Sequence, residues 1–232
     1  MLKLRKSNER GHANHGWLDS HHTFSFSSYY DPRYTGFRDL LVINEDRVNA
    51  GAGFGKHGHR DMEIITYVLE GELEHKDSMG NGSVLQYGDV QRMSAGEGVM
   101  HSEFNHSEKN PVHFLQIWIN PDREGTKSGW EEKTFSKTDK TNKLKLIVSQ
   151  DGREGSLKMN QDASLYASIL EPQKNIEFQV GSHRHAWIQV ARGNLMVNGV
   201  ELTAGDGLAI SEESKLELTA KSESEFLVFD LK

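Results

Sequence analysis

Two short motifs of metal-capable side chains are the most informative feature of this sequence. They are His57-Gly-His59 and His101-Ser-Glu103, and each places two possible ligands at positions i and i+2. On a β-strand that spacing puts both side chains on the same face. Two such strands side by side can therefore direct four nitrogen and oxygen ligands at one point. The motifs predict a metal site built on neighbouring strands.

The rest of the chain has the pattern of an all-β protein that can supply such strands. Short segments rich in β-branched and aromatic residues alternate with glycine, asparagine and aspartate. Strands are predicted at 39–44, 63–70, 114–120, 144–149, 187–191, 194–198 and 225–231. Helical periodicity is scarce, and the segment from Ser164 to Leu170 fits either a helical turn or a further strand.

The composition narrows the class of protein. The chain has 232 residues, 35% of them hydrophobic, which suits one large or two small domains. A net charge of -7 gives no basic surface for nucleic-acid phosphates, so direct nucleic-acid binding is not expected. Because cysteine is absent, any metal must be held by nitrogen and oxygen. The start of the chain is no secretory signal, and no apolar run is long enough to span a membrane, so we expect a cytoplasmic protein.

The two halves of the chain have similar turns. In the first half a strand ends at Gly71 and a Gly-Asp turn follows at Gly88, and in the second half Gly193 and Gly205 repeat this order. A repeated all-strand unit of roughly a hundred residues predicts two tandem jelly-roll barrels. The alternative is that Gly-Asp turns recur by chance, as they do in many β proteins.

A polar segment from Asp122 to Asn142 is the predicted connection between the halves. We place the boundary near residue 135, which gives a metal-binding domain over 1–135 and a degenerate domain without metal over 136–232.

A second His-x-His motif, His183-Arg-His185, does not repeat the register of the first. The first motif lies 14 and 12 positions before its turn glycine, whereas His183 and His185 lie 10 and 8 positions before Gly193. We therefore expect these two histidines to be structural or at the surface. A further motif, His106-Ser-Glu108, follows the turn after the proposed site and is expected in a solvated loop.

Longer strings surround the ligand motifs: Arg10-Gly-His12-Ala-Asn14-His15-Gly-Trp17, His57-Gly-His59-Arg-Asp61-Met62-Glu63, His75-Lys-Asp77-Ser78-Met-Gly80, Met93-Ser94-Ala95-Gly96 and His101-Ser102-Glu103. Over most of the chain these strings resemble the pirin family of cupin proteins, most closely its bacterial members with quercetin 2,3-dioxygenase activity. The resemblance implies two tandem cupin barrels, the jelly-roll architecture expected above.

The resemblance also implies the site and its chemistry. It assigns the metal to His57, His59, His101 and Glu103, so that the usual cupin glutamate ligand is replaced by Glu103. Fe(II) is the first expectation, and nickel, copper, manganese and zinc also suit imidazole and carboxylate ligands. The implied reaction is the cleavage of a flavonol such as quercetin by O₂ with release of CO. Glu103 would act catalytically by accepting the proton of the flavonol 3-hydroxyl.

Further side chains could support this site. Glu63 lies one residue out of the usual cupin ligand register, and such a shift turns a strand side chain to the other face, so we do not expect it to bind the metal. Asp61, Glu63 and Gln116 are candidates to orient the ligand imidazoles through hydrogen bonds.

Two groups of aromatic residues, phenylalanines and histidines, could have either a structural or a functional role. Phe24, Phe26 and Phe54 either line an aromatic substrate pocket or, more commonly for phenylalanine, pack in the core. The histidines of the N-terminal segment are expected at the surface or in hydrogen bonds rather than on a metal; they are His12, His15, His21 and His22.

Two other functions stay open at this point. One is a metal- and redox-dependent module that regulates a protein partner without flavonol turnover. The other is a cupin isomerase or decarboxylase that uses the same metal as a Lewis acid. The acidic charge and the lack of a targeting run favour the enzyme over the regulatory module.

Overall fold

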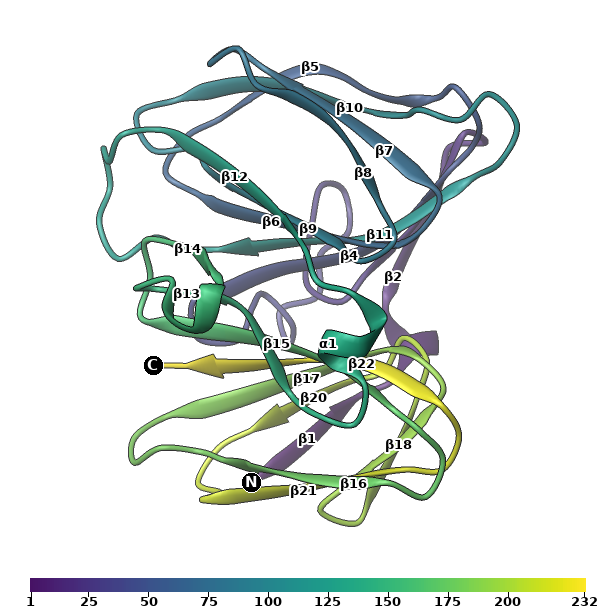
Figure 1. The fold of residues 1–232 in the computed structure, drawn as a ribbon, viewed down its shortest axis with the longest axis vertical. Coiled ribbons are helices and arrows are strands. Elements are labelled where there is room, and N and C mark those ends of the chain that lie inside the picture. Colours follow the sequence, from purple (N-terminus) through teal and green to yellow (C-terminus); the bar gives the residue numbers. More distant parts are fainter. The chain divides into compact units, whose positions relative to one another are not determined.

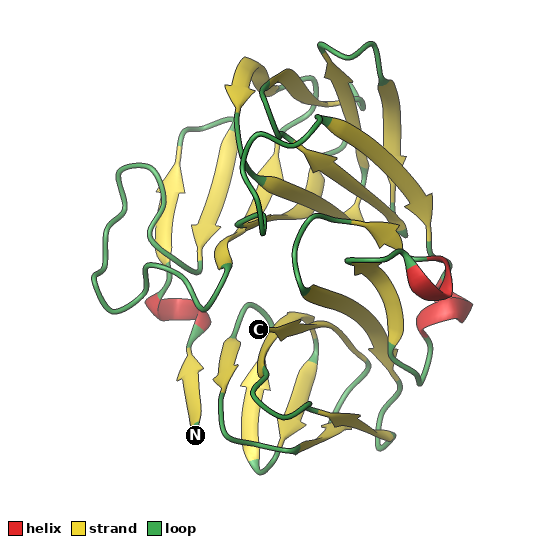
Figure 2. Cartoon of the chain, turned by 90° about the vertical axis from the view of Figure 1, so that its left-hand side faces the viewer, coloured by secondary structure: helices red, strands yellow, loops and turns green.

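The computed structural model describes all 232 residues, and nearly all of its regular structure is β-strand (Figure 1, Figure 2). The one α-helix, α1 (Lys137–Lys140), is a single turn, and there are two 3₁₀ turns, η1 (Ser7–Glu9) and η2 (Arg153–Gly155). No helix has the length and apolar character needed to cross a membrane. The chain forms two compact units: an N-terminal unit (11–134 and 157–161) and a C-terminal unit (1–10, 135–156 and 162–232).

The N-terminal unit contains two facing antiparallel sheets (Figure 1). The larger sheet has the order β12-β9-β6-β11-β4-β3-β2, and the smaller has the order β5-β10-β7-β8. The strands are β2 (Gly11–Asn14), β3 (Leu18–His22), β4 (Leu40–Val48), β5 (Gly53–His59), β6 (Glu63–Glu70), β7 (Glu72–Asp77), β8 (Gly82–Gln86), β9 (Asp89–Ser94), β10 (Val99–Asn105), β11 (Val112–Ile119) and β12 (Gly129–Thr134). The short strand β14 (Leu157–Lys158) also belongs to this unit.

The inner space of the N-terminal unit holds two separate apolar clusters. One includes Val48, Val68 and Phe114, and the other includes Ile64 and Met93. Side chains alternate between the two faces of a strand, so residues two or four positions apart on β4, β6, β9 and β11 point to the same side of the sheet. Between the two clusters, at alternate positions of these same strands, the sequence places polar residues, and these build the candidate site.

The C-terminal unit repeats the arrangement with its own pair of sheets. Its larger sheet contains the order β1-β20-β17-β22-β15-β13, and its smaller sheet has the order β16-β21-β18-β19. The strands are β1 (Leu2–Arg5), β13 (Lys145–Ser149), β15 (Ala163–Leu170), β16 (Asn175–Gln179), β17 (His185–Arg192), β18 (Asn194–Val197), β19 (Val200–Thr203), β20 (Gly207–Ile210), β21 (Lys215–Ala220) and β22 (Ser224–Leu231).

The two units share a strand order, as the matching turns indicate. The order β9-β6-β11-β4 corresponds to β20-β17-β22-β15, and β5-β10-β7-β8 corresponds to β16-β21-β18-β19. Gly71 and Gly193 occupy the same turn, at φ values of 80° and 81°. A Cβ atom there would lie 2.6 Å and 2.1 Å from the backbone oxygens of Pro111 and Glu223, so both turns require glycine. The expectation of two tandem jelly-roll barrels is confirmed.

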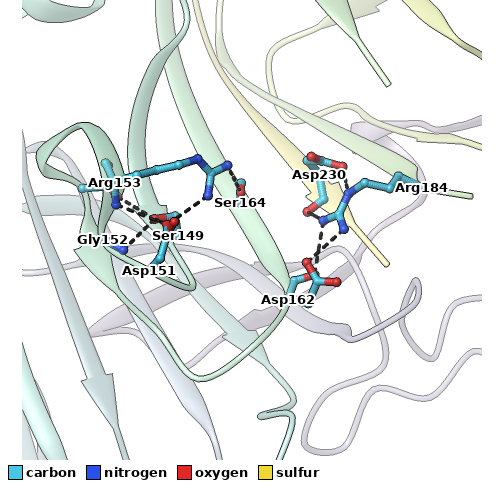
Figure 3. A network of polar contacts seen from close by, with 9 residues as sticks. Ser149, Asp151, Gly152, Arg153, Asp162, Ser164, Arg184 and Asp230 are labelled. Atoms are coloured by element: carbon cyan, nitrogen blue, oxygen red, sulfur yellow. Dashed lines mark hydrogen bonds and ion pairs between the residues drawn. The ribbon is translucent and has the colours of Figure 1, made fainter. Parts of the chain in front are cut away.

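A network of arginine contacts ties together strand ends in the C-terminal unit (Figure 3). Arg184, just before β17, donates from Nε to Asp230 at 2.5 Å and from Nη1 to Asp162 at 3.0 Å. Beside it, Arg153 donates to Ser164 at 2.9 Å and to Asp151 at 3.1 Å. Since these partners lie at the ends of β15 and β22 or in the loop after β13, the network has a structural role.

The structure resolves one ambiguous segment of the sequence and differs from the expectation for two others. Residues 164–170 form a strand within β15, because every position but one is buried and the segment pairs with β22 along its length. The polar segment 122–142 is no plain linker, since its residues 129–134 form β12, a mostly exposed edge strand. The first ten residues lie in the C-terminal unit, because β1 pairs with β20.

Candidate metal centre

Two adjacent strands of the smaller sheet, β5 and β10, carry the predicted ligands, and β7 lies on the other side of β10. Strand β10 pairs with β5 so that His101 lies opposite His57, and it pairs with β7 so that Glu103 lies opposite His75. The burial of β10 alternates, with His101 and Glu103 inward and Met100 and Phe104 outward. A bulge after His101 shifts the pairing of β10 with β5. The i, i+2 spacing therefore places both side chains of the second motif on the inner face.

The strand β5 can approach β10 this closely because position 53 is glycine. A Cβ atom on Gly53 would lie 2.3 Å from the backbone oxygen of Glu103 and 2.5 Å from Cα of Phe104. A larger residue there would push the strand that carries the first motif away from the strand that carries the second.

The three predicted histidine ligands converge. The ring centroid of His57 lies 4.4 Å from that of His101 and 4.8 Å from that of His59, and the His59 and His101 centroids are 4.8 Å apart. Nε2 of His101 lies 3.0 Å from Nε2 of His57. Two nitrogen atoms at this separation can share one ion, since metal–imidazole bonds are about 2.0–2.1 Å long.

The environment keeps these imidazoles ready to bind a cation. Burial and the neighbouring His57 lower the pKa of His59 to about 4. Burial, followed by the other histidines, lowers the pKa of His101 to about 3. Neutral imidazoles at physiological pH retain the lone pair that a metal requires. Nδ1 of His57 is 2.8 Å from the carbonyl oxygen of Gly55, a contact that assigns the proton to Nδ1 and leaves Nε2 as the ligand atom.

Glu103 lies beside His101 but is held by a different set of contacts. Its carboxylate accepts hydrogen bonds from Nε2 of Gln116 at 3.1 and 2.8 Å, and Oγ1 of Thr66 lies 3.5 Å from it. Burial raises the pKa of Glu103 to about 7, although both hydrogen-bonding neighbours lower it. One group of possible ligands contains Glu103, His75 and His101, and another contains His57, His59 and His101; a third, His12, Asp19 and His21, lies on β2 and β3. His101 is common to the first two groups.

A buried His75–Asp77 pair lies directly behind these ligands. Nε2 of His75 is 3.3 Å from Oδ2 of Asp77, and both side chains are fully buried. The His75 ring centroid is 5.4 Å from that of His101 and stacks on Trp130 at 5.9 Å. The i, i+2 spacing of His75 and Asp77 on β7 repeats the pattern of the ligand motifs. That spacing was the available signal for this pair.

A row of buried polar side chains crosses the larger sheet beneath the site. Neighbouring strands bring its members into direct register: His22 with Asn44, Asn44 with Gln116, Gln116 with Thr66, and Thr66 with Gln91. All five are buried. Gln116 links the row to Glu103, and Gln91 links it to His75 through a 3.4 Å contact. The residues around the site are therefore held by polar groups that cannot be recognised from a local sequence motif.

A cavity of about 370 Å³ opens beside the imidazoles within the N-terminal unit. Its walls include His57, His59 and Glu103, together with four aromatic residues. Trp17 and Phe54 pack edge to face at 5.2 Å, and Phe26 and Trp118 do so at 5.3 Å. The volume falls in the usual range for small-molecule sites, roughly 300–1,000 Å³. A flat aromatic ligand would fit between such walls.

The other candidate residues from the sequence differ in their location and in their contacts. Among the three candidate orienting groups, Gln116 contacts a predicted ligand, Glu103. Glu63 instead accepts hydrogen bonds from Ser94 and Asn160, and Asp61 accepts one from the backbone of Gly125. Phe26 and Phe54 line the cavity, whereas Phe24 is a core residue.

The other histidines noted in the sequence are not among the three converging imidazoles. His12 contacts Asp19 at 2.7 Å and stacks on His21, while His15 and His22 are in the cavity wall. His183 lies in the turn before β17, and His185 begins that strand with Nδ1 2.8 Å from Oγ of Ser211. The strands of the C-terminal unit that correspond to β5 and β10 are β16 and β21, which contain no histidine.

Comparison with known proteins identifies the relatives of this chain. The Pirin family model matches residues 3–119, and the model of the quercetinase C-terminal cupin domain matches residues 146–231. A quercetin 2,3-dioxygenase of Escherichia coli strain K12 is 51% identical over 231 residues, covering 100% of this chain and 99% of the relative.

Solved structures agree with this relationship. The crystal structure of YhhW from Escherichia coli has a TM-score of 0.97 at 50% identity and covers 100% of this chain and 98% of that one. A second structure, of bacterial pirin YhhW from the same organism in complex with nickel(II), has a TM-score of 0.95 at 50% identity, with 100% and 99% covered. The chain therefore belongs to the pirin family and consists of two cupin domains, the second of the quercetinase type.

Proposed function

We propose that this protein is a metal-dependent dioxygenase that cleaves a flavonol such as quercetin with O₂ and releases CO. His57, His59, His101 and Glu103 would hold a single divalent ion, with Fe(II) as the native metal. The observation that carries the proposal is the convergence of three imidazoles, beside the buried Glu103 carboxylate, at the wall of an aromatic cavity. The relatives named quercetin 2,3-dioxygenase support the substrate class.

The donor set fits a divalent transition metal. Three imidazoles and one carboxylate would leave such an ion with residual positive charge, which suits it to bind and polarise oxygen atoms of a substrate. The raised pKa of Glu103 shows that its charged form lacks sufficient stabilisation from the protein alone. A bound cation would supply that stabilisation. It would act as a Lewis acid on the 3-hydroxyl and 4-carbonyl oxygens of the flavonol.

The side chains of the protein would perform the remaining tasks. Glu103 would accept the proton of the 3-hydroxyl, and the hydrogen bonds from Gln116 would keep its carboxylate in place. The aromatic pairs Trp17–Phe54 and Phe26–Trp118 would hold the planar ring system and exclude water. In the overall reaction both atoms of O₂ enter the ring-opened ester product, while the carbon that bears the 3-hydroxyl leaves as CO.

Reconstitution of the metal-free protein tests this function. Protein stripped of metal is loaded separately with Fe(II), Ni(II), Cu(II), Mn(II) and Zn(II), and quercetin loss, O₂ consumption and CO release are measured together. We expect equal amounts of all three with at least one metal, and the highest rate with Fe(II). Inactivity with every metal would contradict the proposed function, and protein loaded with its metal would then be the bait for a protein-partner search.

A further inference from the structure

Two residues of the cavity wall each have a buried oxygen atom that lacks a hydrogen-bond donor. The atoms are Oδ1 of Asn44 and Oδ1 of Asp46, and both residues are 4% exposed. Both belong to β4, where positions two apart share a face, and both line the cavity that adjoins the imidazoles. Buried oxygen atoms normally have a donor, because leaving one unpaired destabilises the fold. Two neighbouring exceptions in one wall therefore call for an explanation.

Two polar groups that face Asn44 and Asp46 from the neighbouring strands are already engaged. Gln116, opposite Asn44 on β11, donates to Glu103 and accepts from Thr66 at 2.9 Å. Ser20, opposite Asp46 on β3, is the hydrogen-bonding neighbour of the Asp46 carboxyl. Burial, with smaller contributions from the Glu103 and Glu45 charges, raises the pKa of Asp46 to about 7 despite this bond. Oδ1 of this carboxyl group has no hydrogen-bond partner, so it can accept another donor.

The ligand that supplies these donors must satisfy the rest of the cavity as well. The walls next to Asn44 and Asp46 include the ring of Phe54, which packs against Trp17, and the ring of Trp118, which packs against Phe26. A ligand that is flat and aromatic in its body and carries hydroxyl groups at its edge matches both features. A polyphenol has this combination.

We propose that Asn44 and Asp46 form a hydroxyl-recognition subsite that accepts hydrogen bonds from phenolic hydroxyls of the substrate other than the 3-hydroxyl. For the identity of the substrate this inference rests on the proposed flavonol function. The two residues are specificity determinants and take no part in bond breaking. Sites built to hydrogen-bond a hydroxyl discriminate strongly against analogues that lack it, because their own polar groups are then left unpaired.

A series of flavonols of decreasing hydroxylation tests the subsite. Quercetin, kaempferol and galangin lose the hydroxyls of the pendant ring step by step, and 3-hydroxyflavone lacks every hydroxyl except the reacting one. In the wild type we expect kcat/KM to fall along this series. Asn44→Leu and Asp46→Leu should each lower kcat/KM for quercetin about tenfold more than for 3-hydroxyflavone, as expected for one hydrogen bond.

Binding without turnover provides an independent readout. Protein loaded with nickel is titrated with each flavonol in the absence of O₂, and the dissociation constant is read from quenching of tryptophan fluorescence. The preference for quercetin over 3-hydroxyflavone should shrink about tenfold in each variant. If Asp46→Leu does not fold, Asp46→Asn takes its place, since it keeps the shape of the side chain and replaces one carboxyl oxygen with an NH₂ donor.

Gln91→Leu is the matched control. Gln91 belongs to the same buried row and also has an unpartnered oxygen, but it does not line the cavity. Its substitution should leave the ratio of quercetin to 3-hydroxyflavone unchanged. Equal losses for both flavonols in the Asn44 and Asp46 variants, or an unchanged ratio, would overturn the subsite. Failure of the proposed function looks different: the wild type would turn over no flavonol with any metal, while the binding series would still report on the subsite.

Discussion

Gln116 donates to both carboxylate oxygens of Glu103, over 3.1 and 2.8 Å, from the strand that lies across the barrel from β10. The amide thereby fixes the orientation of the one predicted ligand that is a carboxylate. Thr66 in turn donates to Oε1 of Gln116, which orients the amide itself. The larger sheet therefore positions a ligand that is carried by the smaller sheet.

Replacing Gln116 with leucine should weaken metal binding. The hydrogen bonds of Gln116 lower the pKa of Glu103, so their loss raises that pKa further and leaves the carboxylate free to rotate. We expect metal affinity to fall about 10–100-fold, as is typical when a group that orients a ligand is removed. Competition with a chromophoric chelator measures the affinity. Thr66→Val removes only the bond to Gln116 and a 3.5 Å contact, and should give a smaller loss. Equal affinity in Gln116→Leu and wild type would contradict this account.

Removing His57 or His101 should abolish tight binding of the metal. Each imidazole contributes one of the three converging nitrogens, so His57→Ala and His101→Ala should lower affinity on the order of a hundredfold or more. His185→Ala is the control, because this histidine contacts Ser211 in the C-terminal unit. Metal content after dialysis, determined by elemental analysis, checks the prediction. A metal content that falls in His185→Ala and not in His57→Ala would place the site elsewhere.

Seven of the strands and the two ligand motifs could be predicted from the sequence because they follow from local patterns. Alternation of apolar and polar residues identifies a strand, and i, i+2 spacing puts His101 and Glu103 on one face of it. The bulge after His101, which shifts the pairing of β10 with β5, has no such local pattern. The polar row has no local pattern either, because Asn44, Gln116 and Thr66 become neighbours only through strand pairing.

The polar row of the N-terminal unit has an apolar counterpart in the C-terminal unit. Thr66 and Ile188 lie five positions before the equivalent glycines Gly71 and Gly193. In the N-terminal unit the row through Thr66 is polar, whereas Ile188 pairs with Leu208 on one side and with Val228 on the other. Those residues belong to one continuous apolar core. The duplicated fold thus carries polar side chains at this level in one copy and apolar side chains in the other. This contrast favours the sequence-based expectation that the metal site belongs to the first half.

The raised pKa of Asp46 predicts a specific dependence of stability on pH in the metal-free protein. The folded state, with a pKa of about 7, binds a proton that the unfolded state, with a pKa near 3.8, does not hold between these values. The contribution of Asp46 to stability is therefore complete below pH 4 and is lost as the pH rises through 7. Asp46→Asn removes this loss. Relative to the wild type, the variant should gain roughly 2–3 kcal/mol between pH 5 and pH 8.

Urea unfolding at several pH values, after removal of metal by a chelator, measures the difference. The carboxyl of Glu103 titrates in both proteins, and its charge contributes to the raised pKa of Asp46, so the difference measures Asp46 together with its coupling to Glu103. A constant difference between variant and wild type across this pH range would show that Asp46 is not protonated in the fold.

The last prediction concerns a buried ion pair in the C-terminal unit. Nζ of Lys140, which is fully buried, lies 3.5 Å from Oε1 of Glu225, which is 4% exposed. Burial lowers the pKa of Lys140, and the charge of Glu225 opposes this effect. Removing one partner takes this ion-pair contact away from a charge that stays buried. Lys140→Met and Glu225→Gln should each destabilise the fold by about 3–5 kcal/mol, an effect that denaturant unfolding can measure.

The double variant distinguishes the ion pair from simple packing. If the cost of each single substitution comes from the charge left behind, removing both charges should cost less than the sum of the two single losses. The interaction energy should be about 2–3 kcal/mol at pH 7. The structural role assigned to Lys140 also requires that metal affinity and flavonol turnover stay at wild-type values in every variant that folds. Additive losses would mean that Lys140 and Glu225 stabilise the unit independently, through their own contacts.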